Sequence, residues 1–277
     1  MKKLLNTLYV LTENSYLTLE NENIVVNQET NKVAKIPLLT LESVICFNYP
    51  GASPQLIAAC IKNGIGISFF SPSGKFYYRA QGEYINSSVL TRQAQYRIAE
   101  NEDQKISYVK NMIIGKLYNS KEFIQKFAYN HNHQINENSF KIRINELNTY
   151  IDKINTSTTI DQIRGLEGKA SQIYFDIFPN MILRDKDTFN FISRNRRPPV
   201  DPVNCLLSLA YTVLMHDCAN ACESVGLDPY LGFMHTSRPG RKSLALDLIE
   251  EFRAIIADRF VLYLINNQIR TKIIITK

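Results

Sequence analysis

The spacing of apolar residues changes once along this 277-residue chain, near position 85, and that change constrains the fold more than any other feature. Before it, short apolar or alternating runs are separated by Asn, Glu and Gly, which is typical of β-strands joined by turns. After it, apolar residues recur every three or four positions, which is typical of amphipathic helices. The sequence therefore predicts an α+β protein, with a small sandwich-like β domain over residues 1–86 and an all-α domain over residues 87–277.

The first domain is expected to hold seven short strands and one helix. A hairpin tip is predicted at Asn21-Glu22-Asn23, where polar residues interrupt two apolar runs. Ser53 and Pro54 have the pattern of a helix cap and first turn, and Gly64 of a helix end. The expected strands are Leu8–Leu11, Tyr16–Leu19, Ile24–Val26, Lys35–Leu38, Val44–Phe47, Ile65–Phe70 and Phe76–Arg79.

The second domain is expected to be helical from a boundary at Glu83–Ser88 onward. Helical periodicity covers residues 92–130, 138–155, 160–178, 201–226 and 242–266. The proline-rich stretch at 197–202 is predicted to be a stiff connector, because proline stops one helix and starts the next. The apolar run Ile269–Lys277 follows the last helix without a C-terminal cap.

Composition narrows the class of protein. No apolar run approaches the roughly 20 residues that span a bilayer, and the N-terminus lacks the pattern of a signal peptide. Five cysteines without paired CxxC spacing favour free thiols in a reducing compartment. We therefore expect a cytoplasmic protein with no membrane partner. The net charge of +6 permits a polyanionic partner without proving one.

Glu167 is the first candidate for chemistry. It lies in a helical pattern between Gly165 and Gly168, each of which costs a helix interior about 1 kcal/mol relative to alanine. Close approach of another backbone or of a ligand is the usual compensation. A surface glutamate beside a packing glycine explains the segment at least as well. A P-loop is excluded, because Ile163 and Ala170 stand where that motif needs Gly and Ser or Thr.

A second candidate segment carries His235, Asp247 and Glu250. Ser243 is predicted to cap the helix that follows it, and Asp247 and Glu250, three residues apart, share one helix face. Most other positions of this helix are apolar, so two carboxylates there are costly to bury unless they bind a cation or accept hydrogen bonds. A solvated helix face with a core histidine accounts for the segment equally well.

One imidazole with two or three carboxylates favours Mg²⁺ or Mn²⁺ over zinc. Basic residues gather nearby in sequence without an NTP-binding loop, and this combination points to phosphodiester chemistry on nucleic acid. Such residues would contact backbone phosphates, although a solvated basic face explains them too. The candidates are Arg194, Arg196, Arg197, Arg238, Arg241 and Lys242.

Three stretches together resemble one known family, the CRISPR-associated integrase/endonuclease of spacer acquisition. Ile163–Gly168 resembles its glutamate motif, and Arg196–Ser208 with Tyr211-Thr212 resembles its "RRPP-DP-N-LLS-YT" stretch. Leu231–His235 with Ser243–Arg253 resembles its histidine and acidic motifs. The resemblance extends over the whole chain in the same order, and the motif sequences are most similar to those of the subtype I-C branch.

The resemblance implies metal ligands at Glu167, His235 and Glu250, with Asp247 matching a nearby functional aspartate. It also implies a homodimer, formed through the β domain, that joins a small second CRISPR-associated protein. This complex would insert captured double-stranded DNA fragments into a repeat array. Family members run several dozen residues beyond Lys277, so we expect the chain to end inside their terminal helical region.

Two alternatives remain open at this stage. The first is a stand-alone metal nuclease that acts on branched DNA without integration. The second is a non-catalytic DNA-binding scaffold that uses the same cations. Loss of the carboxylates separates the scaffold from both enzymes, and omission of the small partner separates the two enzymes.

Overall fold

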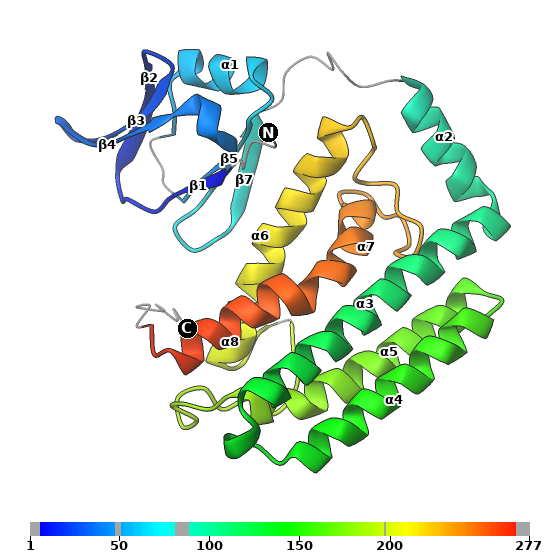
Figure 1. Ribbon diagram of the computed structural model, residues 1–277. Helices are drawn as coiled ribbons and strands as arrows, with labels where there is room; N and C mark the ends of the chain where they lie inside the picture. The colour runs from blue at the N-terminus through cyan, green and yellow to red at the C-terminus, as the bar shows by residue number, and fades with distance from the viewer. Residues whose placement is uncertain (1–5, 48–50, 81–88, 197, 270–277) are drawn as a thin grey trace. The chain divides into compact units, whose positions relative to one another are not determined.

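The computed structural model describes residues 6–47, 51–80, 89–196 and 198–269, and its chain divides into two compact units, Met1–Asn86 and Ser87–Lys277 (Figure 1). The first unit holds strands and one helix, and the second is helical. The predicted α+β class, a β region followed by a helical region, is confirmed. The predicted boundary at Glu83–Ser88 lies outside the described residues.

The first unit contains two sheets. One is four-stranded, in the order β1-β5-β6-β7, with parallel pairs around β5 and an antiparallel edge at β7. The other is the antiparallel meander β2-β3-β4. The bounds are β1 Asn6–Val10, β2 Ser15–Glu20, β3 Asn23–Gln28, β4 Asn31–Pro37, β5 Leu41–Cys46, β6 Gly66–Phe70 and β7 Phe76–Ala80.

Both sheets and helix α1 (Pro54–Lys62) bury side chains in one core. Leu17 and Ile24 reach it from the meander, Val44 and Ile67 from the mixed sheet, and Leu56 from α1. As predicted, Ser53 caps α1: its hydroxyl accepts a hydrogen bond from the Leu56 N–H, and proline occupies the first turn. Seven strands and one helix match the sequence prediction, because here local pattern and burial agree.

The second unit is built on α3, which lies between α4 and α5 on one side and α7 on the other (Figure 1). Polar side chains cap α3 to α6; Asn101 caps α3, and Thr159 and Gln162 form a capping box on α5. The bounds are α2 Val89–Glu100, α3 Glu102–Asn130, α4 Glu137–Thr156, α5 Ile160–Ile177, α6 Pro202–Ser224, α7 Ser243–Phe252 and α8 Arg259–Asn266. Short 3-10 turns cover Leu38–Thr40, Asn132–Gln134 and Phe178–Met181.

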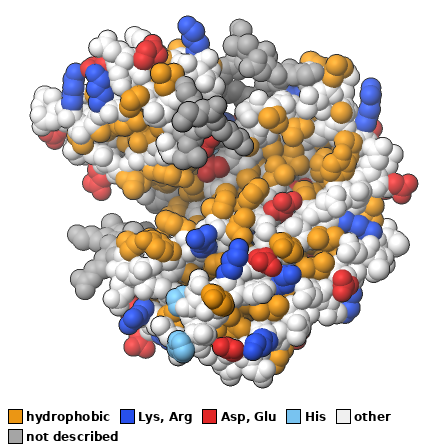
Figure 2. All heavy atoms as spheres, in the orientation of Figure 1, with side chains coloured by type: hydrophobic (Ala, Val, Ile, Leu, Met, Phe, Trp, Pro, Cys, Tyr) orange, Lys and Arg blue, Asp and Glu red, His pale blue; other side chains and the backbone are white. Residues whose placement is uncertain are grey.

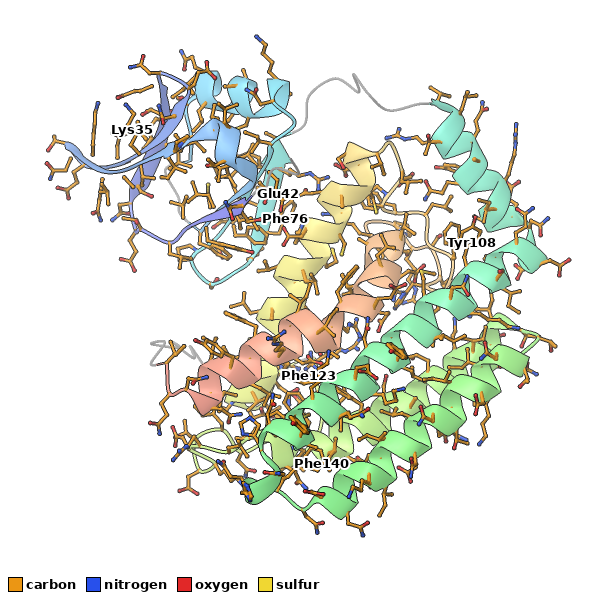
Figure 3. The ribbon with its side chains drawn as sticks, viewed as in Figure 1. Lys35, Glu42, Phe76, Tyr108, Phe123 and Phe140 are labelled. Carbon is orange, nitrogen blue, oxygen red and sulfur yellow. The ribbon has the colours of Figure 1, made fainter. Side chains whose placement is uncertain are left out.

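A large apolar core joins α3, α4, α5, α6 and α8, and a smaller apolar cluster lies between α6 and α7. Phe140 of α4 is fully buried and stacks against Phe127 of α3 with ring centroids 6.3 Å apart (Figure 3). No helix in the described ranges is long and apolar enough to cross a membrane.

Two helix predictions needed correction. The helix expected over 92–130 is broken at Asn101, whose side chain caps α3. The helix expected over 242–266 contains a π-helical turn at Arg253–Asp258 between α7 and α8. Ser243 does not cap α7: it is the first helical residue, and its hydroxyl donates to the Thr236 carbonyl over 3.3 Å.

Candidate active site

Two helices and one loop carry the predicted residues, and a third helix adds one more. Glu167 lies on α5, Asp247 and Glu250 lie one turn apart on α7, and His235 lies in the loop between α6 and α7. Lys116 of α3 joins them, because its Nζ contacts a carboxylate oxygen of Glu167 and lies 2.8 Å from Glu250 Oε2. Residues separated by up to 134 positions therefore share one site.

Asp247 is a fully buried cradle for the histidine loop. Three successive backbone N–H groups, those of residues 233–235, donate to its carboxylate over 2.6, 3.0 and 2.9 Å. His235 Nδ1 lies 2.6 Å from Asp247 Oδ1. With Nδ1 donating to the carboxylate, the other ring nitrogen is the one left to accept a proton or a cation. Asp247 thus orients His235 rather than facing the site itself.

Gly232 allows this close packing. A Cβ added there would lie 2.7 Å from the Ser243 Cβ and 2.8 Å from Asp247 Oδ2, so any side chain would push the loop off α7. Arg164 holds the same loop from α5. Its Nε donates to the Met234 carbonyl over 3.0 Å, and Nη2 also contacts that oxygen. The loop that carries His235 is therefore fastened to both α7 and α5.

Glu250 is buried, with only 4% of its side chain exposed, and lies between two cations. Lys116 contacts Oε2, and Arg253 Nη2 lies 3.0 Å from Oε1. Burial by itself raises the pKa of Glu250, but the nearby charges of Lys116, Arg253 and His235 lower it to about 2. The carboxylate is therefore ionised at neutral pH.

Arg253 connects Glu250 to a buried network of tyrosines and an aspartate. Arg253 lies over the Tyr211 ring, 4.9 Å from its centroid. The hydroxyls of Tyr211 and Tyr174 donate to the carboxylate of Asp258 over 2.5 and 2.8 Å. Burial is the largest influence on the pKa of Asp258 and raises it to about 6, against the lowering effect of these hydrogen bonds and of nearby arginines.

A cavity of about 210 Å³ opens beside Glu167. Lys116, Arg196 and Arg253 line it together with the acidic residues Glu167 and Asp258. Lys116 and Arg253 are ion-paired within the site, so Arg196, which is exposed, is the lining cation best placed to meet an anion such as a phosphate.

The donor set fits a hard divalent cation in chemistry: two carboxylates and an imidazole. Glu250 Oε2 is a buried oxygen with no well-directed hydrogen bond, although the Lys116 ammonium is 2.8 Å away. Within the described ranges, however, no three His, Cys, Asp or Glu side chains converge closely enough to hold a metal ion as they stand. Lys116 lies between the two carboxylates instead.

The predicted phosphate-binding residues fall in different environments. Arg194 is turned inward: its guanidinium donates to Asn204 over 2.6 Å and to Ser208 over 3.2 Å. Arg196 is exposed and lines the cavity. Arg238 is exposed and Arg241 half-buried, while Lys242 Nζ lies 3.1 Å from His216 Nδ1. Arg197 lies outside the described residues.

The glycines beside Glu167 do not serve packing. An added Cβ at Gly165 or at Gly168 would meet nothing within 4 Å among the described residues, and both positions are exposed. Among the described residues, therefore, neither packing nor close approach of another backbone explains these glycines. Approach of a ligand remains.

Sequence reasoning missed Lys116, Arg164, Arg253 and Asp258. A signal existed for Lys116, which falls three and four positions after Ile113 and Met112 on the buried face of α3. A lysine in an apolar stripe needs a buried partner, and neither Glu167 nor Glu250 is identifiable as that partner from spacing alone. The contact of Arg164 with a carbonyl 70 positions away has no comparable signal in the sequence.

The fold and this site together place the chain in a known class. The family model described as "CRISPR associated protein Cas1" matches residues 8–274. The chain belongs to this family of CRISPR-associated endonucleases. It is 41% identical to the CRISPR-associated endonuclease Cas1 1 of Chlorobaculum tepidum, over 98% of this chain and 79% of that protein. With the CRISPR-associated endonuclease Cas1 2 of Rhodospirillum rubrum, it shares 40% identity over 97% and 78%.

Solved structures have the same fold at lower identity. A CAS1 protein from Thermotoga maritima superposes with a TM-score of 0.78 at 19% identity, over 96% of this chain and 80% of that one. A casposase bound to its integration product superposes with a TM-score of 0.77 at 21% identity, over 97% and 75%. A β unit followed by a helical unit is thus the architecture of these relatives.

Proposed function

We propose that this chain is a divalent-metal-dependent DNA endonuclease and integrase that inserts captured DNA fragments as new spacers into a CRISPR array. Glu167, His235 and Glu250 would hold Mg²⁺ or Mn²⁺, and Asp247 would orient His235. The observation that carries the proposal is the convergence of Glu167 and Glu250, 83 positions apart in sequence, on one ammonium group. His235, which a buried aspartate fixes in place, lies close enough for its charge to act on Glu250.

The chemistry divides between the metal and the side chains. A bound divalent cation would polarise the scissile phosphate and stabilise the charge that develops on it. In the joining step, the 3′-hydroxyl of the captured fragment gives up its proton to water, and its oxygen forms a bond to phosphorus. The bond from phosphorus to the 3′-oxygen of the repeat strand breaks, and that oxygen leaves as a new hydroxyl after it gains a proton.

The cavity beside Glu167 fits this role. Arg196 and Arg253 line it and would hold the phosphate oxygens, so that the phosphorus lies next to the carboxylates. The exposed Gly165 and Gly168 leave the surface of α5 clear for a nucleic-acid backbone to approach Glu167.

The proposed partners are double-stranded DNA, a second copy of the chain and the small second CRISPR-associated protein, Cas2. Related folds support the DNA and Cas2 proposals: one solved structure is a TtCas1–DNA complex with a TM-score of 0.52, and another is a Cas6-RT-Cas1–Cas2 complex with a TM-score of 0.74. The homodimer and the I-C subtype remain predictions from sequence.

Replacing Glu167 or Glu250 with Gln tests the metal site. Each change should lower Mn²⁺-supported cutting and joining of a plasmid-borne repeat by about a hundredfold or more, because a ligand should count for at least as much as the residues that orient it. DNA binding should survive, since the change removes negative charge. Glu251→Gln, on the same helix next to Glu250, is the matched control and should stay active.

The outcome also separates the alternatives. If both carboxylate variants cut and join as well as the parent protein, the proposed metal site is wrong and the DNA-binding scaffold is favoured. If cutting of branched DNA is metal-dependent but integration never occurs even with the small partner present, the chain is a stand-alone nuclease.

A further inference from the structure

Lys116 reaches the site from a helix that carries none of the predicted ligands. Its Nζ contacts Glu167 Oε1, lies 2.8 Å from Glu250 Oε2 and donates to Ser171 Oγ over 2.9 Å. Only 10% of the lysine side chain is exposed, against 19% for Glu167 and 4% for Glu250. The three charged groups therefore form an ion triplet whose side chains are largely buried.

The charges of this triplet explain why it is stable. Two buried carboxylates so close together repel one another and lose hydration, and a cation between them offsets both costs. Arg253 Nη2 lies 3.0 Å from one oxygen of Glu250, whereas its attraction to Glu167 acts over a longer range than an ion pair. Lys116 is thus the cation that both carboxylates share.

Lys116 and Glu250 attract one another by charge, without a well-directed hydrogen bond between them. Oε2 lies 2.8 Å from the ammonium, yet it accepts no hydrogen bond of good geometry. The ammonium donates hydrogen bonds to Glu167 and Ser171, but at Glu250 another cation can replace it, and a divalent ion offers twice the charge at shorter ligand distances. The flexible four-carbon stem of lysine lets Nζ move without a change in the helix.

Building on the metal site proposed above, we propose that Lys116 is a positioning residue whose ammonium holds Glu167 and Glu250 together before the metal arrives, and that a divalent cation enters by displacing it. The resident lysine lowers the apparent metal affinity of the site. Once displaced, Nζ remains beside the cavity that Ser171, Arg196 and Arg253 line, where a DNA phosphate would meet it.

Lys116→Gln tests this competition. The amide can still donate to Glu167 or Ser171 but carries no charge, so Mn²⁺ should bind about tenfold tighter to the variant when the full chain is titrated by calorimetry. Lys116→Met, which lacks the donors too, should show the same direction. Lys121→Gln is the matched control: Lys121 lies on α3 with its Nζ 3.8 Å from Glu122, away from the site, and its replacement should leave Mn²⁺ affinity unchanged.

Thermal unfolding supplies a readout that a merely structural lysine would not move. Without metal, Lys116→Gln should unfold at a lower temperature than the parent protein, because two carboxylates are left uncompensated. Saturating Mn²⁺ should close most of that gap. A structural lysine would instead leave the same gap with and without Mn²⁺, and that result would overturn the proposal.

Two other outcomes are distinguishable. If both Lys116 variants fold and bind Mn²⁺ as weakly as the parent or more weakly, the lysine does not compete with the metal, while the metal site itself stands. If neither the parent nor the variants bind Mn²⁺, while Glu167→Gln behaves like the parent, the metal site fails and this inference fails with it.

Discussion

Asp247 shows how one buried carboxylate positions a reactive side chain. It accepts hydrogen bonds from three consecutive backbone N–H groups and lies 2.6 Å from the His235 ring. These contacts use both oxygens, so this carboxylate acts through His235. Glu250, one turn further along α7, faces cations instead, which is why the same helix supplies two acids with different roles.

Asp247→Asn should separate orientation from direct binding. An asparagine places an N–H₂ group against backbone N–H donors, so one side of the cradle is lost and the imidazole is no longer held by a negative charge. We expect Mn²⁺ affinity, measured by calorimetry, to fall by roughly 10- to 100-fold. Asp152→Asn, an exposed position on α4, should change nothing. Unaltered Mn²⁺ affinity in the Asp247 variant would refute the orienting role.

Asp258 predicts a pH dependence of stability. Its pKa is raised from the ordinary 3.8 to about 6, so the folded state holds this proton at a pH where the unfolded chain has released it. Stability contributed at this position is therefore greatest below pH 4 and is lost as pH rises through 6. Chemical denaturation of Asp258→Asn and the parent protein should show the parent losing stability relative to the variant between pH 4 and pH 6, by on the order of 2 kcal/mol. A constant difference across that range would contradict the assignment.

At the scale of elements, α5 combines three roles in two turns. Arg164 ties the helix to the histidine loop, Glu167 faces Lys116, and Gly165 and Gly168 keep its outer surface clear. The π-helical turn Arg253–Asp258 directly follows α7. It places Arg253 and Asp258 in the buried network. π-turns of this kind often occur beside functional sites, where they reset the direction of side chains.

The glycines give a test at this scale. Gly165→Ala and Gly168→Ala should each stabilise the protein against denaturant by up to about 1 kcal/mol, because alanine is the better helix former and meets no neighbour. If DNA lies against α5, the same changes should weaken DNA binding. Gly232→Ala is the contrasting variant and should destabilise, since its Cβ would overlap Ser243 and Asp247. Full DNA affinity in both α5 variants would argue against contact at this face.

For the whole molecule, the net charge of +6 does not gather in a single patch on the face that Figure 2 presents. Figure 2 shows basic side chains of the helical unit standing among acidic and apolar ones on the face that it presents. Binding of DNA should therefore depend on particular cations, such as Arg196 at the cavity and Arg238 in the exposed loop. Arg194, whose guanidinium is held by Asn204 and Ser208, is the predicted cation with the least freedom to take part.

Salt titrations of DNA binding measure this directly. The logarithm of the association constant for DNA should fall linearly with the logarithm of the salt concentration. The slope should be about −0.9 for each phosphate that is neutralised. Arg238→Gln should lower the steepness of this slope by about one, whereas Arg194→Gln should mainly lower stability. Binding that is insensitive to salt would remove the phosphate-contact model for these residues.

Local sequence signals were enough to predict a β region followed by a helical region, most of the elements and the segments that carry the site. Periodicity, caps and turn residues are local signals, so Ser53 could be recognised as a cap and each of the seven strands could be located. The residues Glu167, His235, Asp247 and Glu250 were picked out by spacing and by resemblance to a family. Local rules failed where a cap and a helix start compete, as at Asn101 and Ser243.

The role of each of these residues follows from contacts that form only in the folded chain. The Lys116–Glu167 contact joins positions 51 apart, the Arg164–Met234 contact 70 apart and the Tyr211–Asp258 contact 47 apart. Such pairs form because a buried charge or donor must find a partner, and the partner is set by how helices pack rather than by distance along the chain. The change of apolar spacing near residue 85 predicted a helical domain. The packing of its helices places a lysine between the two carboxylates of the site.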